Sequence, residues 1–357
     1  MNNFWILVGF EYKKIFNSKI NAILLAIILI FSVAVVLLNA YGGNYYHSIG
    51  TDISKIEALK LDKETMNSNK GFVTDEVIKE TIILAQNGYN DKENYFYNAQ
   101  GKEVLKPDAQ REFILPYSNI YFFLNNLFDS KFDLSDGSRP IEHLSSNDIN
   151  DFYKSYKQLL ADNINYNNTL TLNEKNKHID MIEKIKTPFY NEYAGGWLSI
   201  RNMFPLLGIL ILTSIAIAIG NIFGKEYSNK TDAVILSTKK GKSVLIAAKI
   251  TTAITFAILS TVLISGCYIG TYLFTHGLDG GNVPLQLLGG FEYSTYPVTI
   301  GEFVGICCVV FLATAIAFSC FCAMVSAIFN NSVTALSLLM LSVFAPMFIP
   351  PVDDRLF

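Results

Sequence analysis

The chain has 357 residues, 51% hydrophobic and 17% charged, with a formal net charge of −3. Most of the charge lies in one block, residues 41–201, which holds 18 Lys or Arg and 23 Asp or Glu and so carries a net charge of −5. A nucleic-acid footprint would be basic, so nucleic acid is excluded as a partner.

The N-terminal segment, residues 1–19, predicts a helix lying in the membrane interface. Apolar residues recur on one broad helical face, and the lysines lie toward the other side. Such a helix places its tryptophan at headgroup level. The interfacial residues that we predict are Trp5, Phe10, Lys13 and Lys14. The alternative is a simple extension of the first span, which the bend-forming pair Asn17 and Ser18 disfavours.

Long apolar stretches predict an all-α polytopic membrane protein with five transmembrane helices. A spanning helix needs about 20 apolar residues, and helices satisfy their own backbone groups in hydrocarbon. Buried core helices of a soluble protein fit less well, because these stretches are apolar all round. The five predicted spans are residues 20–40, 203–223, 244–274, 303–329 and 333–349.

Lysine-rich loops predict the orientation. The N-terminal segment and the segment 224–243 are rich in lysine, whereas the loop 275–302 has no Lys or Arg. The positive-inside rule then places the N-terminus in the cytoplasm and the block 41–201 outside the cell. The loop 275–302 is extracellular in this scheme, as is the end, residues 350–357.

The extracellular block 41–201 is predicted to be mostly helical. Thr171 and Glu174 form a capping box before an apolar stripe, and Ser146 is a candidate cap for a second long helix, so the two can form an antiparallel pair. Residues 75–86 and 118–128 predict two more helices. The block has no cysteine, which excludes a disulfide framework there.

The sequence contains no complete catalytic or phosphate-binding motif. Gly241, Lys242 and Ser243 look like the end of a phosphate-binding loop, but Leu236 stands where its first glycine should be. We therefore predict no catalytic residue, no metal site and no cofactor in this chain. Lys249 lies early in its span, where its stem can snorkel to the surface. Two glycine pairs fit close helix packing: Gly266 with Gly270, and Gly301 with Gly305.

Several of these residues resemble a known family. The run from Phe223 to Lys249 is similar to the second cytoplasmic segment of ABC-2-type permeases: an aromatic residue, an acidic residue, a threonine and a Leu-Ser pair precede a basic turn and a span with an early lysine. Residues 10–19 resemble the N-terminal connecting helix of those proteins. The outer loop, with Gly280-Gly281, Pro284-Leu285-Gln286 and the run 296–301, is similar to that of low-GC Gram-positive members.

The resemblance implies a permease subunit of an ATP-driven ABC exporter in the plasma membrane of a Gram-positive bacterium, moving an amphiphilic substrate such as a peptide antibiotic or a lipid-like molecule. It implies a second permease subunit and separate ABC ATPase subunits that bind ATP and Mg. The segment 226–237 would then be a coupling helix, and Glu226 could pair with a cation on the connecting helix or on the ATPase. The implied ATPase-contact residues are Glu226, Tyr227, Thr231, Leu236 and Ser237.

Two other functions are also compatible with the sequence, and the chain departs from the family pattern in its number of spans. The chain could be a membrane-anchored sensor or assembly protein whose extracellular block binds a ligand, or an ion transporter without an ATPase, which the absence of paired intramembrane charges disfavours. The family usually has six spans, so the sixth is expected to be missing from these 357 residues.

Overall fold

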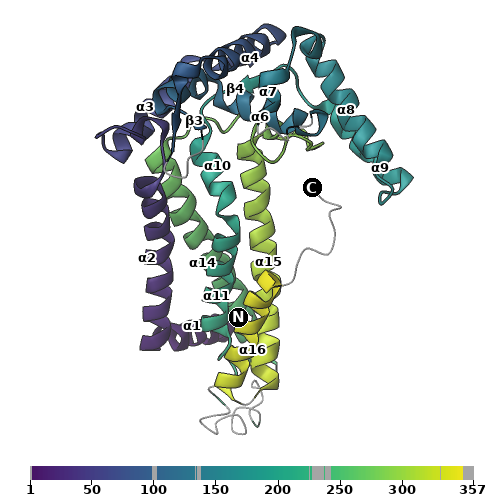
Figure 1. Cartoon of the computed structure of the whole chain (residues 1–357). Helices are drawn as coiled ribbons and strands as arrows, with labels where there is room; N and C mark the ends of the chain where they lie inside the picture. Colours follow the sequence, from purple (N-terminus) through teal and green to yellow (C-terminus); the bar gives the residue numbers. More distant parts are fainter. Residues whose placement is uncertain are drawn as a thin grey trace. The chain divides into compact units, whose positions relative to one another are not determined.

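The computed structural model describes residues 2–98, 103–132, 134, 138–224, 226, 237, 243–329 and 331–348. The chain divides into two compact units. We call residues 1–37, 200–274 and 305–352 the membrane unit, and residues 38–199 and 275–304 the polar unit. Figure 1 shows the course of the chain through both.

Long apolar helices build the membrane unit. They are α1 (Asn2–Phe16), α2 (Lys19–Gly42), α11 (Phe204–Ile219), α14 (Val244–His276), α15 (Ile300–Ile328) and α16 (Ser332–Phe344), with α10 (Gly195–Asn202) leading into α11. Only α2, α14 and α15 are each long and apolar enough to cross a membrane, among the helices described. A fourth span results if α10 and α11, bent by 52° at their junction, count as one.

The structure therefore supports three or four spans where the sequence predicts five. The last apolar stretch forms α16, which has 13 residues before a 3-10 turn at Ala345–Phe348. At 1.5 Å per residue such a helix covers about 20 Å, less than the roughly 30 Å of a hydrocarbon core. The second predicted span is shorter too: α11 begins at Phe204, with Pro205 in its first turn, and already ends at Ile219.

The N-terminal helix is separate from the first span, as the sequence predicts. Helix α1 ends at Phe16 and α2 begins at Lys19, and Figure 1 shows α1 running across the end of α2. The bend at Asn17 and Ser18 thus excludes a simple extension. Val8 and Ile15 are buried, while Trp5 and Phe10 are exposed.

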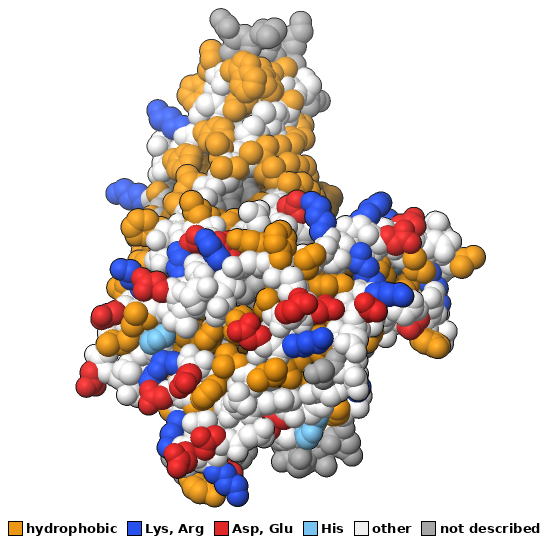
Figure 2. Space-filling view, turned by 90° about the horizontal axis from the view of Figure 1, so that it is seen from above, with side chains coloured by type: hydrophobic (Ala, Val, Ile, Leu, Met, Phe, Trp, Pro, Cys, Tyr) orange, Lys and Arg blue, Asp and Glu red, His pale blue; other side chains and the backbone are white. Residues whose placement is uncertain are grey.

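Short helices and strand pairs build the polar unit. The helices are α3 (Lys55–Ser68), α4 (Asp75–Asn90), α5 (Pro107–Phe113), α6 (Ser118–Phe128), α7 (Pro140–His143), α8 (Phe152–Tyr166) and α9 (Leu172–Lys184). Strand β1 (Gly71–Val73) pairs antiparallel with β4 (Phe189–Asn191), and β2 (Tyr95–Tyr97) pairs with β3 (Glu103–Leu105). In Figure 2 acidic and basic side chains are interspersed, and neither sign gathers into one large patch.

Most of the predicted helices of this block are confirmed. Helix α6 has the predicted bounds, and Thr171 caps α9 through the predicted box with Glu174. Helices α8 and α9 form an antiparallel pair, in which Lys157 bonds the Glu183 carbonyl and Lys175 bonds that of Asn165. The capping prediction at Ser146 is wrong, because residues 146–149 form a 3-10 turn and Asp151, at φ 51°, delays the start of α8 to Phe152.

The loop predicted as a separate segment, residues 275–302, belongs to the core of the polar unit. Val283, Leu285 and Ile300 are buried in the same apolar cluster as Phe123 and Phe189. The buried Glu292 carboxylate accepts hydrogen bonds from the Asn126 amide and the Gly290 N–H. Two distant stretches of chain therefore share one core.

Candidate functional site

Four charged side chains meet inside the membrane unit, and we call them the charge cluster: Glu11, Lys14, Glu226 and Lys249. Glu11 and Lys14 lie on α1, Lys249 lies in the second turn of α14, and Glu226 follows the end of α11. The cluster thus joins three elements that are far apart in the sequence.

Each cation of the charge cluster contacts both carboxylates. Lys249 Nζ lies 3.1 Å from Glu11 Oε2 and 2.8 Å from Glu226 Oε1. Lys14 Nζ lies 2.6 Å from Glu11 Oε1 and 3.0 Å from Glu226 Oε1. The charges alternate and sum to zero, which is the arrangement that lets ions stay buried.

Lys249 has two further partners at the end of α11. Its ammonium donates to the Ile222 carbonyl at 2.6 Å and lies 5.0 Å from the centre of the Phe223 ring. A cation near the C-terminal end of a helix is favoured by the helix dipole and by the free carbonyls there. These contacts fix the turn that leads from α11 into the segment carrying Glu226.

Burial makes the inner pair of the cluster energetically important. The Lys249 and Glu11 side chains are 1% and 2% exposed, whereas Lys14 is 45% exposed. Removing one partner of a buried pair costs roughly 3–5 kcal/mol, because the other charge is left uncompensated. The outer Lys14 contributes less, since exposed pairs are worth about 1 kcal/mol or less.

Lys14 remains charged in this setting. Partial burial lowers its pKa, but the hydrogen bonds and negative charges of Glu11 and Glu226 outweigh that effect, and the net result is a pKa above the usual value. The Lys14 ammonium therefore holds the outer edge of the cluster at any pH near neutrality.

Neighbouring contacts hold α1 and the turn after α11 in place. The Tyr12 hydroxyl donates to Thr255 Oγ1 of α14 at 2.7 Å, and the rings of Phe16 and Phe256 lie 6.3 Å apart. The backbone N–H groups of Phe223 and Gly224 both donate to Ser326 Oγ of α15. Helix α1 is thus held against α14, and α15 contacts the turn directly.

The predicted site residues divide into three groups. Lys14 and Glu226 meet in the cluster, which confirms that Glu226 pairs with a cation on the N-terminal helix. Trp5, Phe10, Lys13 and Ser237 are exposed. Tyr227, Thr231 and Leu236 lie outside the described residues, so contact of this segment with an ATPase stays a prediction.

The glycine pairs do not pack as the spacing predicts. Open space surrounds the positions where Cβ atoms would stand on Gly266, Gly270 and Gly305 within this chain. Gly301 is crowded, but by the Gly281 backbone of the polar unit and not by another spanning helix. The predicted close helix packing at the first three is therefore not made within the described part of this chain.

Sequence reasoning missed the centre of the cluster. The sequence predicts that Lys249 snorkels to the surface, and its pattern does not single out Glu11. Lys249 is instead buried, because an acid on α1 faces it. The available signal was the position of Glu11 between Val8 and Ile15, at helical spacing on the face of α1 that is buried.

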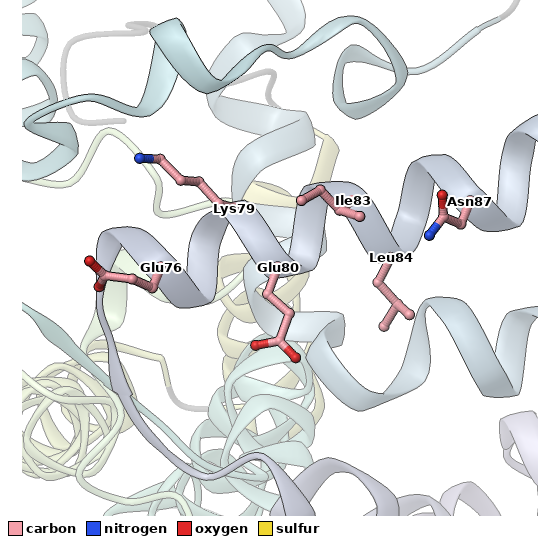
Figure 3. Close-up of a pocket in the computed structure, with 6 residues that line it drawn as sticks. All are labelled: Glu76, Lys79, Glu80, Ile83, Leu84 and Asn87. Atoms are coloured by element: carbon pink, nitrogen blue, oxygen red, sulfur yellow. The ribbon is translucent and has the colours of Figure 1, made fainter.

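A groove of about 400 Å³ on the polar unit is a weaker candidate. Its lining residues all belong to α4, and Figure 3 shows Lys79 and Glu80 pointing to opposite sides of that helix. Polar groups do not converge there as they do in a small-molecule site. Among the described residues, no three His, Cys, Asp or Glu side chains are placed to hold a metal ion.

Comparison with known families matches residues 117–351, about two-thirds of the chain, to the family described as ABC-2 family transporter protein. The match begins inside the polar unit and includes α11, α14 and α15, whereas α1 lies outside it. No curated protein and no solved structure matches significantly. The chain belongs to the ABC-2 transporter family and is a membrane permease component of an ABC transporter, a transport subunit and not the ATPase.

Proposed function

We propose that this chain is the permease half of an exporter in the plasma membrane, in which a second permease subunit completes the path and separate ATPase subunits bind ATP and Mg. The proposed cargo is an amphiphile such as a peptide antibiotic or a lipid-like molecule. The observation that supports this proposal best is the charge cluster, which connects the segment proposed to contact the ATPase with two membrane helices.

The charge cluster suggests how ATPase closure moves the permease. A movement of the segment 226–237 would displace Glu226, whose carboxylate forms ion pairs with both Lys14 on α1 and Lys249 on α14. Because these contacts are buried or partly buried and several act together, the three elements are expected to move as one rigid body. The ATPase stroke would thus move α1, α14 and the turn after α11 together, relative to the rest of the membrane unit.

Leu236→Asp tests the ATPase contact. We expect the ATPase subunit that copurifies with this chain to fall at least about tenfold, because an unpaired carboxylate in an apolar contact costs more than the roughly 1.4 kcal/mol that equals a factor of ten. Permease-dependent ATP hydrolysis in proteoliposomes should fall with it.

Leu172→Asp is the matched control, since Leu172 is an exposed leucine of the polar unit. It should leave both copurification and hydrolysis unchanged. Normal copurification of the Leu236→Asp variant would refute the contact. Absence of any ATPase from the purified wild-type chain would favour the sensor or assembly role.

Orientation is a second testable part of the proposal. A cysteine at Asn147 in the polar unit should react with an impermeant thiol reagent added to whole cells, because this unit is proposed to lie outside. A cysteine at Lys240, in the lysine-rich segment, should react only after the cells are opened. The reverse pattern would overturn the proposed topology.

A further inference from the structure

The half of α14 beyond the charge cluster buries a face made of hydroxyl groups. Thr261, Ser265, Tyr268 and Tyr272 are spaced by four, three and four residues, which places them on one side of the helix. Thr261 is 3% exposed, Ser265 is 8% exposed, and both tyrosines are fully buried. We call these four residues the hydroxyl row.

Two members of the hydroxyl row differ from Thr252 and Thr255 of the same helix. Thr252 donates to the Ala248 carbonyl at 2.8 Å and Thr255 donates to that of Thr251 at 2.7 Å. Thr261 Oγ1 and Ser265 Oγ have no hydrogen-bond partner among the described residues. On α11, Thr213 Oγ1 is also buried and has no hydrogen-bond partner among the described residues.

Such groups are costly where they stand. A buried hydroxyl without a partner loses its hydrogen bonds to water and gains none, so apolar residues would serve packing better. Inside a membrane bundle, polar side chains that face the interior commonly mark a pathway for substrate or water. Unpartnered hydroxyls of this kind are therefore typical of a surface that contacts water in another conformation.

The chemistry of the row limits what it can bind. Residues 250–275 include no Lys, Arg, Asp or Glu. Hydroxyl groups donate and accept hydrogen bonds, and the Tyr268 and Tyr272 rings, 5.2 Å apart and edge to face, add an aromatic surface. A neutral hydrogen-bonding group, such as an amide or a hydroxyl, fits this surface better than an ionised headgroup.

We propose that the hydroxyl row lines the translocation path and, when the helices separate, faces water and hydrogen-bonds the neutral polar part of the cargo. This rests on the proposed exporter function and deepens it. In the conformation described here the path is closed, which leaves Thr261 and Ser265 unsatisfied.

Water access is the direct test. Cysteines are placed singly at Thr261 and Ser265 in a chain whose five native cysteines are alanine, and the permease–ATPase complex in vesicles is exposed to the water-soluble thiol reagent 2-sulfonatoethyl methanethiosulfonate. Leu259→Cys is the control, because Leu259 is at nearly the same depth but 59% exposed on the opposite side of α14. We expect modification at least about tenfold faster at the row than at Leu259 in one nucleotide state.

The outcomes separate the row from the exporter function. If the row cysteines are modified as slowly as Leu259→Cys in vesicles that hydrolyse ATP, the proposal that the row lines the path is wrong. The proposed exporter function would be unaffected by that result. Fast labelling that ATP does not change would support a wet path and count against coupling to an ATPase.

A second measurement tests the row without any ATPase. Thr261→Val should leave the midpoint of thermal unfolding unchanged or raise it, because the lost hydroxyl has no partner. Thr252→Val is the control and should lower it, since that hydroxyl is bonded to Ala248. A fall of several degrees in the Thr261→Val variant would show a satisfied structural hydroxyl and refute the proposal.

Discussion

Replacing Lys249 with methionine is expected to destabilise the membrane unit by about 3 kcal/mol. Methionine keeps the length and the packing of the lysine stem, so the loss is that of the charge. Glu11 would remain buried with its inner partner gone, although Lys14 still contacts it, which places the cost at the lower end for a broken buried pair. Glu226 and the Ile222 carbonyl would each lose a donor as well.

Unfolding in detergent, followed by heat or denaturant, measures this effect, and two controls sharpen it. Lys13→Met removes an exposed lysine from α1, the helix that carries Glu11 and Lys14, and should change stability by about 0.5 kcal/mol or less. The double variant Glu11→Gln with Lys249→Met removes both buried charges. It should lose less stability than the sum of the losses in the two single variants. Strict additivity would show that the two residues do not act as a pair.

Gly280→Ala is expected to destabilise the polar unit by about 3 kcal/mol or more, combining backbone strain with overpacking. Gly280 has φ +86°, a conformation that residues with a Cβ rarely adopt. Its added Cβ would also meet backbone, at 2.2 Å from the Tyr193 carbonyl oxygen and 2.5 Å from Ala194 Cα. Neither atom can move aside without displacing the chain before α10.

Gly50→Ala is the matched control, because Gly50 has φ +73° but only the Pro107 ring within 4 Å of an added Cβ. It should cost about 1 kcal/mol from strain alone. Resistance of the polar unit to limited proteolysis, together with thermal unfolding, compares the two. Equal effects of both substitutions would contradict the close approach at Gly280.

Local patterns predict the helices of this chain well. The capping box at Thr171, the apolar face of residues 118–128 and the bend at Asn17 all depend on neighbours within a few positions, and sequence shows such neighbours directly. The span count fares worse, because an apolar stretch does not reveal where its helix ends, as α11 does at Ile219 and α16 does at Phe344. The exact ends of a helix depend on backbone angles, as Asp151 illustrates.

Long-range pairing is where sequence fails. Glu11 and Lys249 are 238 residues apart, and a local pattern shows only a charge in an apolar setting, which snorkelling also explains. Likewise, the loop 275–302 has too few apolar residues to look like part of a core until the segments around Phe123 and Phe189 are beside it. The family resemblance suggests a role for the segment after α11, but it does not reveal the contacts of Glu226 with Lys14 and Lys249.

The shared core of the polar unit has a consequence for biogenesis. The residues up to 199 emerge from the ribosome long before Val283, Leu285 and Ile300, with α11 and the whole of α14 made in between. At about 5–20 residues per second, the delay of roughly 100 residues is on the order of 5–20 s. During that interval the first part exposes an unfinished apolar face, so its folding must wait for the later helices to be inserted.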